Sequence, residues 1–266
     1  MKNRSRRNSG NPGRPAKPKV HRPAVKEIRL NKFIANAGIC SRRDADLLIQ
    51  EGKIKVNGRV IHAMGYKVLP KDRVTYQGKV LIGEKPVYVL LNKPKDYITT
   101  TDDPKQRKTV MQLVNKACDE RIVPVGRLDR NTTGLLLLTN DGDLHKKLTH
   151  PSHEVKKIYH VQLDRPIHNR DFQTLLDGLE LDDGPVALDS VEMVSQDSTE
   201  LGLQLHSGRN RIVRRIFEYL GYEVIKLDRV VFAGLTKKDL PRGKWRKLTQ
   251  REIIQLKHLS DLRTKT

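Results

Sequence analysis

Hydrophobic positions early in the chain recur at the spacing of a short amphipathic helix. Leu30, Phe33, Ile34 and Ala37 lie one to four residues apart and share one helix face. Gly38 follows directly and predicts the end of this helix, because glycine readily adopts the left-handed conformation found there. The folded part of the chain is therefore expected to begin with a helix.

A second helix and a hairpin are predicted directly afterwards. Ser41 and Asp44 have the spacing of a capping box, which starts a helix whose apolar face comes from residues 47–49. Strand-like residues then flank Asn57-Gly58, the dipeptide most typical of a two-residue hairpin turn. Residues 28–75 are thus expected to hold two helices followed by a small sheet.

The second part of the chain alternates between strand-like and helical patterns. Unbroken apolar runs predict buried strands at residues 87–91 and 134–138. Asn140-Asp141-Gly142 predicts a turn after the second run, and Asp143 is expected to cap a helix that starts at Leu144. Further helices are predicted at 110–114, 167–179, 212–220 and 250–259, and further strands at 154–163, 201–205 and 224–227.

The charge of the chain favours a polyanionic partner. The 52 Lys and Arg residues outnumber the 31 Asp and Glu residues and give a net charge of +21. Nucleic acid is the leading candidate for so basic a chain. A membrane surface is the competing partner, but no apolar stretch approaches the ~20 residues of a spanning helix, and the N-terminus lacks the apolar core of a secretory signal. We therefore expect a cytoplasmic protein without a membrane partner.

Composition also divides the chain into segments. Residues 1–27 hold nine Lys or Arg, one acid and almost no large apolar side chains, so this tail is expected to be disordered. It is either a solubilising extension or a segment that attracts RNA phosphates. The other segments are a small domain at 28–75, a linker at 76–86, a larger domain at 87–259 and a C-terminal tail at 260–266.

No metal and no cofactor are expected. Cys40 and Cys118 lie far apart and neither belongs to a Cys-x-x-Cys pair, so they predict neither a metal site nor a disulfide framework. The nine His residues lack the spacing of metal ligands. The chain also has no Walker sequence and no dinucleotide fingerprint.

A carboxylate between two arginines lies at the mouth of the second buried strand. Arg127-Leu128-Asp129-Arg130 alone is more typical of a surface ion-pair cluster than of an active site. The longer segment, however, resembles the signature of the RsuA family of pseudouridine synthases, through Gly126-Arg127-Leu128-Asp129, Thr133-Gly134-Leu135-Leu136 and Thr139-Asn140-Asp141-Gly142. The resemblance implies that Asp129 is the catalytic nucleophile.

Three other stretches extend this resemblance. Tyr159, in the basic strand at 154–163, is by itself typical of a core aromatic, but the family has a Tyr here that packs on the target base. Residues 208–215 are similar to a family signature that aligns Arg214 with the arginine that pairs with the catalytic Asp. Ile212 departs from the Gln or Glu of many relatives, a difference that concerns local RNA contacts and leaves the catalytic pair intact. Lys93 is in a Lys-Pro pair that the family has beside the catalytic loop, where it is expected to support that loop.

The N-terminal pattern resembles the S4 RNA-binding domain, with Arg42 and Arg43 opening its second helix. Residues 28–75 hold ten Lys or Arg against four acids, which supports an RNA-binding role for this segment. Phosphate contacts are mostly made by such side chains, although each one is about as typical of a solvated surface. Our candidates for RNA or substrate binding are Arg42, Arg43, Lys53, Lys55, Arg59, Lys93, Arg127, Arg209, Arg211 and Arg215.

The resemblances together imply an α+β protein with a mixed, mainly antiparallel sheet flanked by helices. The implied activity is isomerisation of uridine to pseudouridine in ribosomal RNA by a monomer, either on free RNA or on a ribosome-assembly intermediate. The substrate of first choice is 23S RNA and the alternative is 16S RNA. Residues 183–185 and 241–245 are closest to the type B synthases of the large ribosomal subunit, whereas 28–46 is closer to type F, so the target uridine stays open.

Two other functions are alternatives to pseudouridine formation. One is a non-catalytic RNA-binding or ribosome-assembly factor that uses the S4-like domain and retains a degenerate enzyme domain. The other is a different RNA-acting enzyme such as a methyltransferase, which should have a glycine-rich loop after its first strand. This sequence lacks such a loop.

Overall fold

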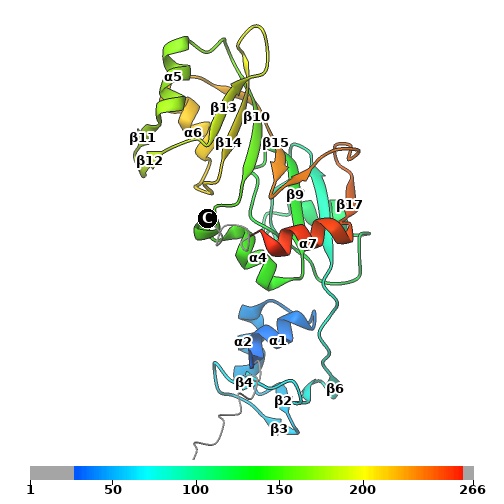
Figure 1. The fold of residues 1–266 in the computed structure, drawn as a ribbon. Coiled ribbons are helices and arrows are strands. Elements are labelled where there is room, and N and C mark those ends of the chain that lie inside the picture. The colour runs from blue at the N-terminus through cyan, green and yellow to red at the C-terminus, as the bar shows by residue number, and fades with distance from the viewer. Residues whose placement is uncertain (1–26, 260–266) are drawn as a thin grey trace, which may run out of the picture.

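The structure is a computed structural model that describes residues 27–259 (Figure 1). The tails predicted at 1–27 and 260–266 lie outside the described residues, apart from Glu27. A small N-terminal domain precedes a larger domain built on a nine-stranded sheet. Within residues 27–259, no helix is long and apolar enough to cross a membrane.

The N-terminal domain packs two helices against short strands. Its two-stranded pair joins β1 to β4, and its four-stranded sheet has the order β3-β2-β5-β6. The elements are β1 (Ile28–Arg29), α1 (Leu30–Asn36), α2 (Arg42–Gln50), β2 (Ile54–Val56), β3 (Arg59–Val60), β4 (Lys67–Val68), β5 (Val74–Tyr76) and β6 (Lys79–Val80).

Local sequence signals account for most of this domain. Ser41 and Asp44 form the predicted capping box at the start of α2. Asn57 and Gly58 both have positive φ, +50° and +82°, as a tight hairpin turn between β2 and β3 requires. The predicted apolar face of α2 was correct for Ile49, which is buried, but wrong for Leu47, which is 55% exposed; Ala45 is buried beside Ile49.

The N-terminal domain extends further than predicted. β5 and β6 lie in the same sheet as β2, and Leu81 is part of the same hydrophobic core. The linker predicted at 76–86 therefore begins too early, because residues 76–81 belong to the N-terminal domain. The glycine that suggested the linker, Gly78, has a φ of +77° and lies in the turn of the β5–β6 hairpin.

The larger domain has a mixed, mainly antiparallel sheet, as predicted. Its main path is β13-β14-β10-β15-β9-β7-β17, in which only the β15–β9 pair is parallel. The main strands are β7 (Tyr88–Lys93), β9 (Thr133–Thr139), β10 (Lys157–Leu163), β13 (Ser190–Met193), β14 (Glu200–Leu205), β15 (Val224–Phe232) and β17 (Trp245–Lys247). The shorter strands are β8 (Val123–Pro124) beside β9, β16 (Leu235–Thr236) beside β15, and the separate hairpin of β11 (Leu179–Leu181) and β12 (Gly184–Val186).

Helices cover both halves of this sheet (Figure 1). β9 is buried on its two faces, since Leu135 and Leu137 belong to one core cluster and Leu136 and Leu138 to another, which explains its unbroken apolar run. The helical segments are α3 (Val110–Val114), α4 (Gly142–Thr149), the 3-10 turn η1 (Pro151–His153), α5 (Asn169–Asp177), α6 (Ile212–Tyr219) and α7 (Gln250–His258).

The start of α4 differs from the prediction. Asp141, not Asp143, is the N-cap, and its carboxylate accepts hydrogen bonds from the backbone N–H groups of Asp143 and Leu144. The helix therefore begins at Gly142, two residues earlier than expected. Asp143 lies in the first turn, where its negative charge interacts favourably with the positive end of the helix dipole. It also forms an ion pair with Lys32 of the N-terminal domain at 2.5 Å.

Gly134 allows the parallel contact between β9 and β15. Its φ is +108°, and a Cβ atom built there would lie 2.3 Å from the backbone oxygen of Arg229. Because this obstacle is backbone, it cannot move aside as a side chain can.

We expect Gly134→Ala to destabilise the protein by about 3 kcal/mol, since it adds overpacking to an unfavourable φ. Thermal or urea unfolding measures this loss. Gly142→Ala is the matched control, because a Cβ atom at Gly142 meets open space. Equal stability of the two variants would contradict the proposed close approach.

Candidate active site

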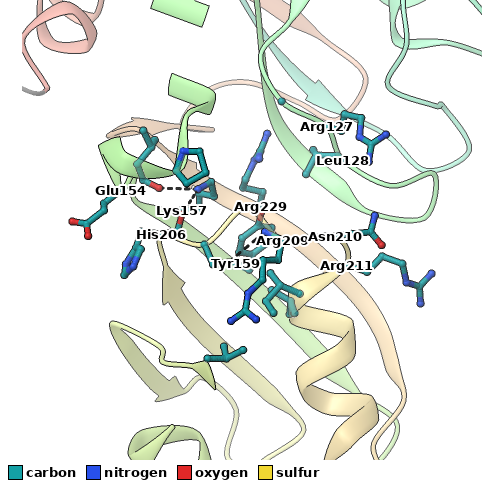
Figure 2. A pocket seen from close by; sticks show the side chains of 18 of the residues that line it. Arg127, Leu128, Glu154, Lys157, Tyr159, His206, Arg209, Asn210, Arg211 and Arg229 are labelled. Atoms are coloured by element: carbon teal, nitrogen blue, oxygen red, sulfur yellow. Dashed lines mark hydrogen bonds between the residues drawn. The ribbon is translucent and has the colours of Figure 1, made fainter. Parts of the chain in front are cut away.

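A cavity of about 1200 Å³ lies in the larger domain where distant segments of the chain meet. Its walls include the β8–β9 loop, β10, the β11–β12 hairpin, the segment before α6, and β15 (Figure 2). The sequence-predicted residues among its lining are Arg127, Asp129, Tyr159, Arg209 and Arg211. The fold therefore brings together five residues from three segments that are widely spaced along the chain.

Asp129 lies in the β8–β9 loop and is half-buried. Its backbone carbonyl accepts hydrogen bonds from Lys93 Nζ at 3.0 Å and from the Thr132 N–H at 3.1 Å. The preceding residue, Leu128, is buried, and its carbonyl accepts from Thr99 Oγ1 at 2.8 Å. The carboxylate is thus carried by a loop whose backbone is fixed on both sides.

Lys93 anchors this loop through hydrogen bonds to its backbone. Its ammonium is fully buried at the end of β7 and donates to the backbone carbonyls of Pro94, Asp129, Arg130 and Thr132 at 2.8–3.3 Å. Burial lowers the pKa of Lys93 to about 8, while the charges of Asp129 and Asp96 act in the opposite direction. The predicted contact of Lys93 with RNA is wrong, because its ammonium is buried and donates to backbone carbonyls. These hydrogen bonds agree with the other expectation, that Lys93 supports the loop.

Tyr159 lies on β10 beside the cavity and is half-buried. It packs against hydrophobic residues on both sides of the domain. Its strand neighbours are Leu203 on β14 and Arg229 on β15. The ring can therefore contribute to the core and still present a surface to the cavity.

Arg214 does not form the predicted two-pronged ion pair with Asp129. Within the described chain, its guanidinium donates instead to the backbone carbonyl of Val224 at 2.8 Å. Burial and the charge of Arg211 lower the pKa of Arg214, and the charge of Asp129 raises it. The two side chains are thus electrostatically coupled without a direct hydrogen bond, an arrangement that often tightens only when substrate binds.

The other arginines around α6 mostly fasten the β11–β12 hairpin. Arg209 and Arg215 pair with Asp183 at 2.8 and 2.7 Å, and Arg215 also pairs with Asp182. The hydrogen bond from Arg215, with the charge of Arg209, lowers the pKa of Asp183 to about 2. Arg211 precedes α6 and pairs with Glu218 at 2.9 Å. Arg127 also lines the cavity; it is exposed and lies two residues before Asp129 in the sequence.

The candidates in the N-terminal domain are all exposed but lie away from the cavity lining. Lys53 pairs with Glu51 at 2.6 Å, and Arg42 donates weakly to Asn31 at 3.4 Å. Phosphate contact by these side chains stays a prediction. The full set is Arg42, Arg43, Lys53, Lys55 and Arg59.

Sequence reasoning missed a buried ion cluster behind the loop. Asp228 on β15 accepts hydrogen bonds from Thr133 Oγ1 and Arg242, both at 2.8 Å, and from Lys237. Burial alone would raise the pKa of Asp228, but these hydrogen bonds lower it to about 2. Lone charges in a strand and a loop give no local signal, so only the fold reveals that Asp228 ties the start of β9 to the C-terminal segment.

Asp228→Asn is expected to lose about 2 kcal/mol of stability at neutral pH, because the fold lowers the pKa of this carboxyl from 3.8 to about 2. The folded-state pKa lies below the usual 3.8, so the carboxylate stabilises the fold above that pH and its contribution fades as the pH falls to about 2. Chemical unfolding at several pH values measures this, with the exposed Asp239→Asn as control. A stability difference that persists undiminished at pH 2 would argue against the ion cluster as its cause.

Comparison with known proteins agrees with this architecture. The family model for RNA pseudouridylate synthase matches residues 87–219, and the S4 domain model matches residues 28–74. The ribosomal large subunit pseudouridine synthase B of Bacillus subtilis is 43% identical over 88% of this chain and 97% of that protein. The dual-specificity RNA pseudouridine synthase RluF of Salmonella typhi is 36% identical over 86% of this chain and 78% of that protein. A crystal structure of a pseudouridylate synthase superposes with a TM-score of 0.62 at 29% identity, over 86% of this chain and 99% of that one.

The fold and the cavity thus define an RNA-modifying enzyme with a separate N-terminal RNA-binding domain. The chain belongs to the RNA pseudouridine synthase family, and its N-terminal domain is an S4 domain.

Proposed function

We propose that this enzyme converts a uridine of 23S ribosomal RNA to pseudouridine, with Asp129 as the catalytic nucleophile. The observation that carries the proposal is the position of Asp129 on a fixed loop, in one cavity with Tyr159. A substrate in the large ribosomal subunit is supported by the 43% identity to a Bacillus subtilis enzyme whose name specifies that subunit. The basic S4 domain supplies a second surface for the RNA.

The reaction breaks the bond between uracil N1 and the ribose, turns the base, and joins its C5 to the same sugar carbon. C5 then releases its proton and N1 takes one up, so that product and substrate have the same atoms. The target nucleotide has to leave its stack to enter the cavity. The Asp129 carboxylate attacks or stabilises the electron-poor sugar carbon while the base is detached. Tyr159 stacks on the uracil, because an aromatic ring can pack on any pyrimidine face. The net change is an isomerisation, so the proposed chemistry consumes no second substrate.

Arg214 is assigned a positioning role in this proposal. The charge of Asp129 raises the pKa of Arg214, so the two groups interact electrostatically. Closure of the cavity on RNA would bring the guanidinium into the two-pronged pair that holds a carboxylate in one orientation. Arg127 is assigned to the RNA backbone, because it is exposed at the cavity mouth. The cytoplasmic location and the monomeric state remain predictions.

Mapping of pseudouridine in ribosomal RNA tests the substrate. Cells that lack the gene are expected to lose pseudouridine at a 23S site and to regain it with the wild-type protein but not with Asp129→Asn. Loss from 16S RNA alone would refute the choice of 23S RNA. An unchanged map of both RNAs would refute ribosomal RNA as the substrate.

A further inference from the structure

Two cationic side chains lie beside Tyr159 in the cavity wall. Lys157 is two residues before Tyr159 on β10, so the two side chains share one face of the strand. Arg229 on β15 is the cross-strand partner of Tyr159 and therefore lies next to it. All three line the cavity, and Figure 2 labels them in the same part of its wall.

Arg229 has hydrogen-bonding capacity that the protein leaves unused. The residue is 3% exposed; its Nε donates to the Leu135 carbonyl at 2.8 Å, and its guanidinium stacks 4.5 Å above the Phe232 ring. Its Nη2 is buried and has no hydrogen-bond partner among the described residues. A buried cationic donor without an acceptor is unfavourable, which points to an acceptor supplied from outside the chain.

Lys157 also has a hydrogen-bond donor without an acceptor among the described residues. Its Nζ donates to the carbonyls of Val155 and His206 at 2.9 and 2.6 Å, which uses two of the three donors of an ammonium group. Both acceptors are uncharged. Burial, followed by the charge of Arg229, lowers the pKa of Lys157 to about 8, and Asp189 acts in the opposite direction. The charge of Arg229 thus acts against that of Lys157, and each of the two side chains has one donor without an acceptor among residues 27–259.

We propose that Arg229 and Lys157 together bind one phosphate of the RNA strand next to the target uridine. A phosphodiester offers two acceptor oxygens and one negative charge, so it satisfies both donors and offsets the repulsion between the cations. A carbonyl of the base would satisfy a donor but leave the repulsion in place. The inference rests on the proposed function, because it requires RNA in this cavity with the base on Tyr159.

Salt-dependent RNA affinity tests the contact. Arg229→Gln and Lys157→Gln are each introduced into the Asp129→Asn variant, so that binding of an unmodified 23S transcript is measured without turnover. Each is expected to weaken binding about tenfold, the effect of one charged hydrogen bond. The slope of log affinity against log salt should also become shallower by about 0.7, as for one phosphate contact on a single strand.

Arg165→Gln is the matched control. Arg165 also stacks on a ring, that of Tyr222 at 4.5 Å, and also donates to a backbone carbonyl, that of Gly221. It does not line the cavity, so its loss removes the same net charge without removing the contact. The control should keep the parent slope.

The outcomes separate the alternatives. Slopes of Arg229→Gln and Lys157→Gln equal to that of Arg165→Gln would overturn the proposal. A slower isomerisation in the Asp129-containing enzyme with an unchanged slope would indicate contact with the base and would also overturn it. If Arg229→Gln does not fold, as judged by its thermal melt, the less buried Lys157→Gln carries the test alone. Failure of the proposed function is recognised separately, as absence of pseudouridine formation by the wild-type enzyme on the same transcript.

Discussion

Replacement of Asp129 by asparagine is expected to reduce pseudouridine formation at least about a thousandfold, equivalent to about 4 kcal/mol of transition-state stabilisation. Asparagine has nearly the same shape, so the loop held by Lys93 should keep its conformation. The amide cannot supply a negative charge or an effective nucleophile to the sugar carbon. RNA affinity should stay near the wild-type value, since most of the positive surface is unchanged.

Single-turnover assays on an unmodified transcript measure the rate, and filter binding measures the affinity. Asp96→Asn is the control, because Asp96 is an exposed carboxylate attached to the same loop through Arg130, at 3.2 Å. Such a surface pair contributes little, so this variant should isomerise uridine normally. Wild-type turnover by Asp129→Asn would reject Asp129 as nucleophile. If neither the wild type nor Asp129→Asn isomerises uridine, and both still support normal cell function, the non-catalytic RNA-binding alternative is favoured.

Replacement of Lys93 by methionine is expected to lower both stability and turnover. Methionine keeps the apolar stem but removes every donor. The carbonyls of Asp129 and Arg130 retain other partners, whereas those of Pro94 and Thr132 lose their bond to the ammonium. We expect a loss of about 3 kcal/mol in the free energy of unfolding, because buried acceptors are left unsatisfied. Turnover below the melting temperature should fall about a hundredfold, since a small misplacement of Asp129 disturbs the reacting geometry.

Urea unfolding and single-turnover rates, measured on the same preparations, test this expectation. Lys95→Met is the matched control, because Lys95 is exposed two residues further along the chain. It should change neither quantity. If Lys93→Met has the stability of Lys95→Met, the ammonium is not an anchor of the loop. If its stability falls but its turnover below the melting temperature does not, the anchor does not determine the position of Asp129.

Local signals predicted the elements well. The capping box at Ser41, the turn at Asn57-Gly58 and the helix end at Gly38 were all correct, because each depends on residues within a few positions of one another. The helix at Val110–Val114 also has the predicted bounds. Where two neighbouring residues could serve the same purpose, the local signal did not discriminate. Asp141 and Asp143 could each cap α4, and the approach of the chain out of β9 selected Asp141.

Burial was less predictable than secondary structure. Leu47 fits the apolar face of α2 by spacing, yet it is exposed, because the direction of that face depends on the helix and sheet packed against it. The end of the N-terminal domain was misplaced for a related reason. Residues 74–81 look like a polar hairpin and linker until β5 pairs with β2.

From the sequence, the contiguous motifs resemble known families, and that resemblance implied the S4 domain, the mixed sheet and Asp129 as the candidate nucleophile. Only the tertiary structure decided how Asp129 is held. The hydrogen bonds from Lys93, the cluster around Asp228 and the placement of Arg229 beside Tyr159 join residues far apart in the chain. No local pattern encodes such contacts, because they arise only when separate strands pair in one register. That register brings a carboxylate, an aromatic ring and two incompletely bonded cations to the same cavity.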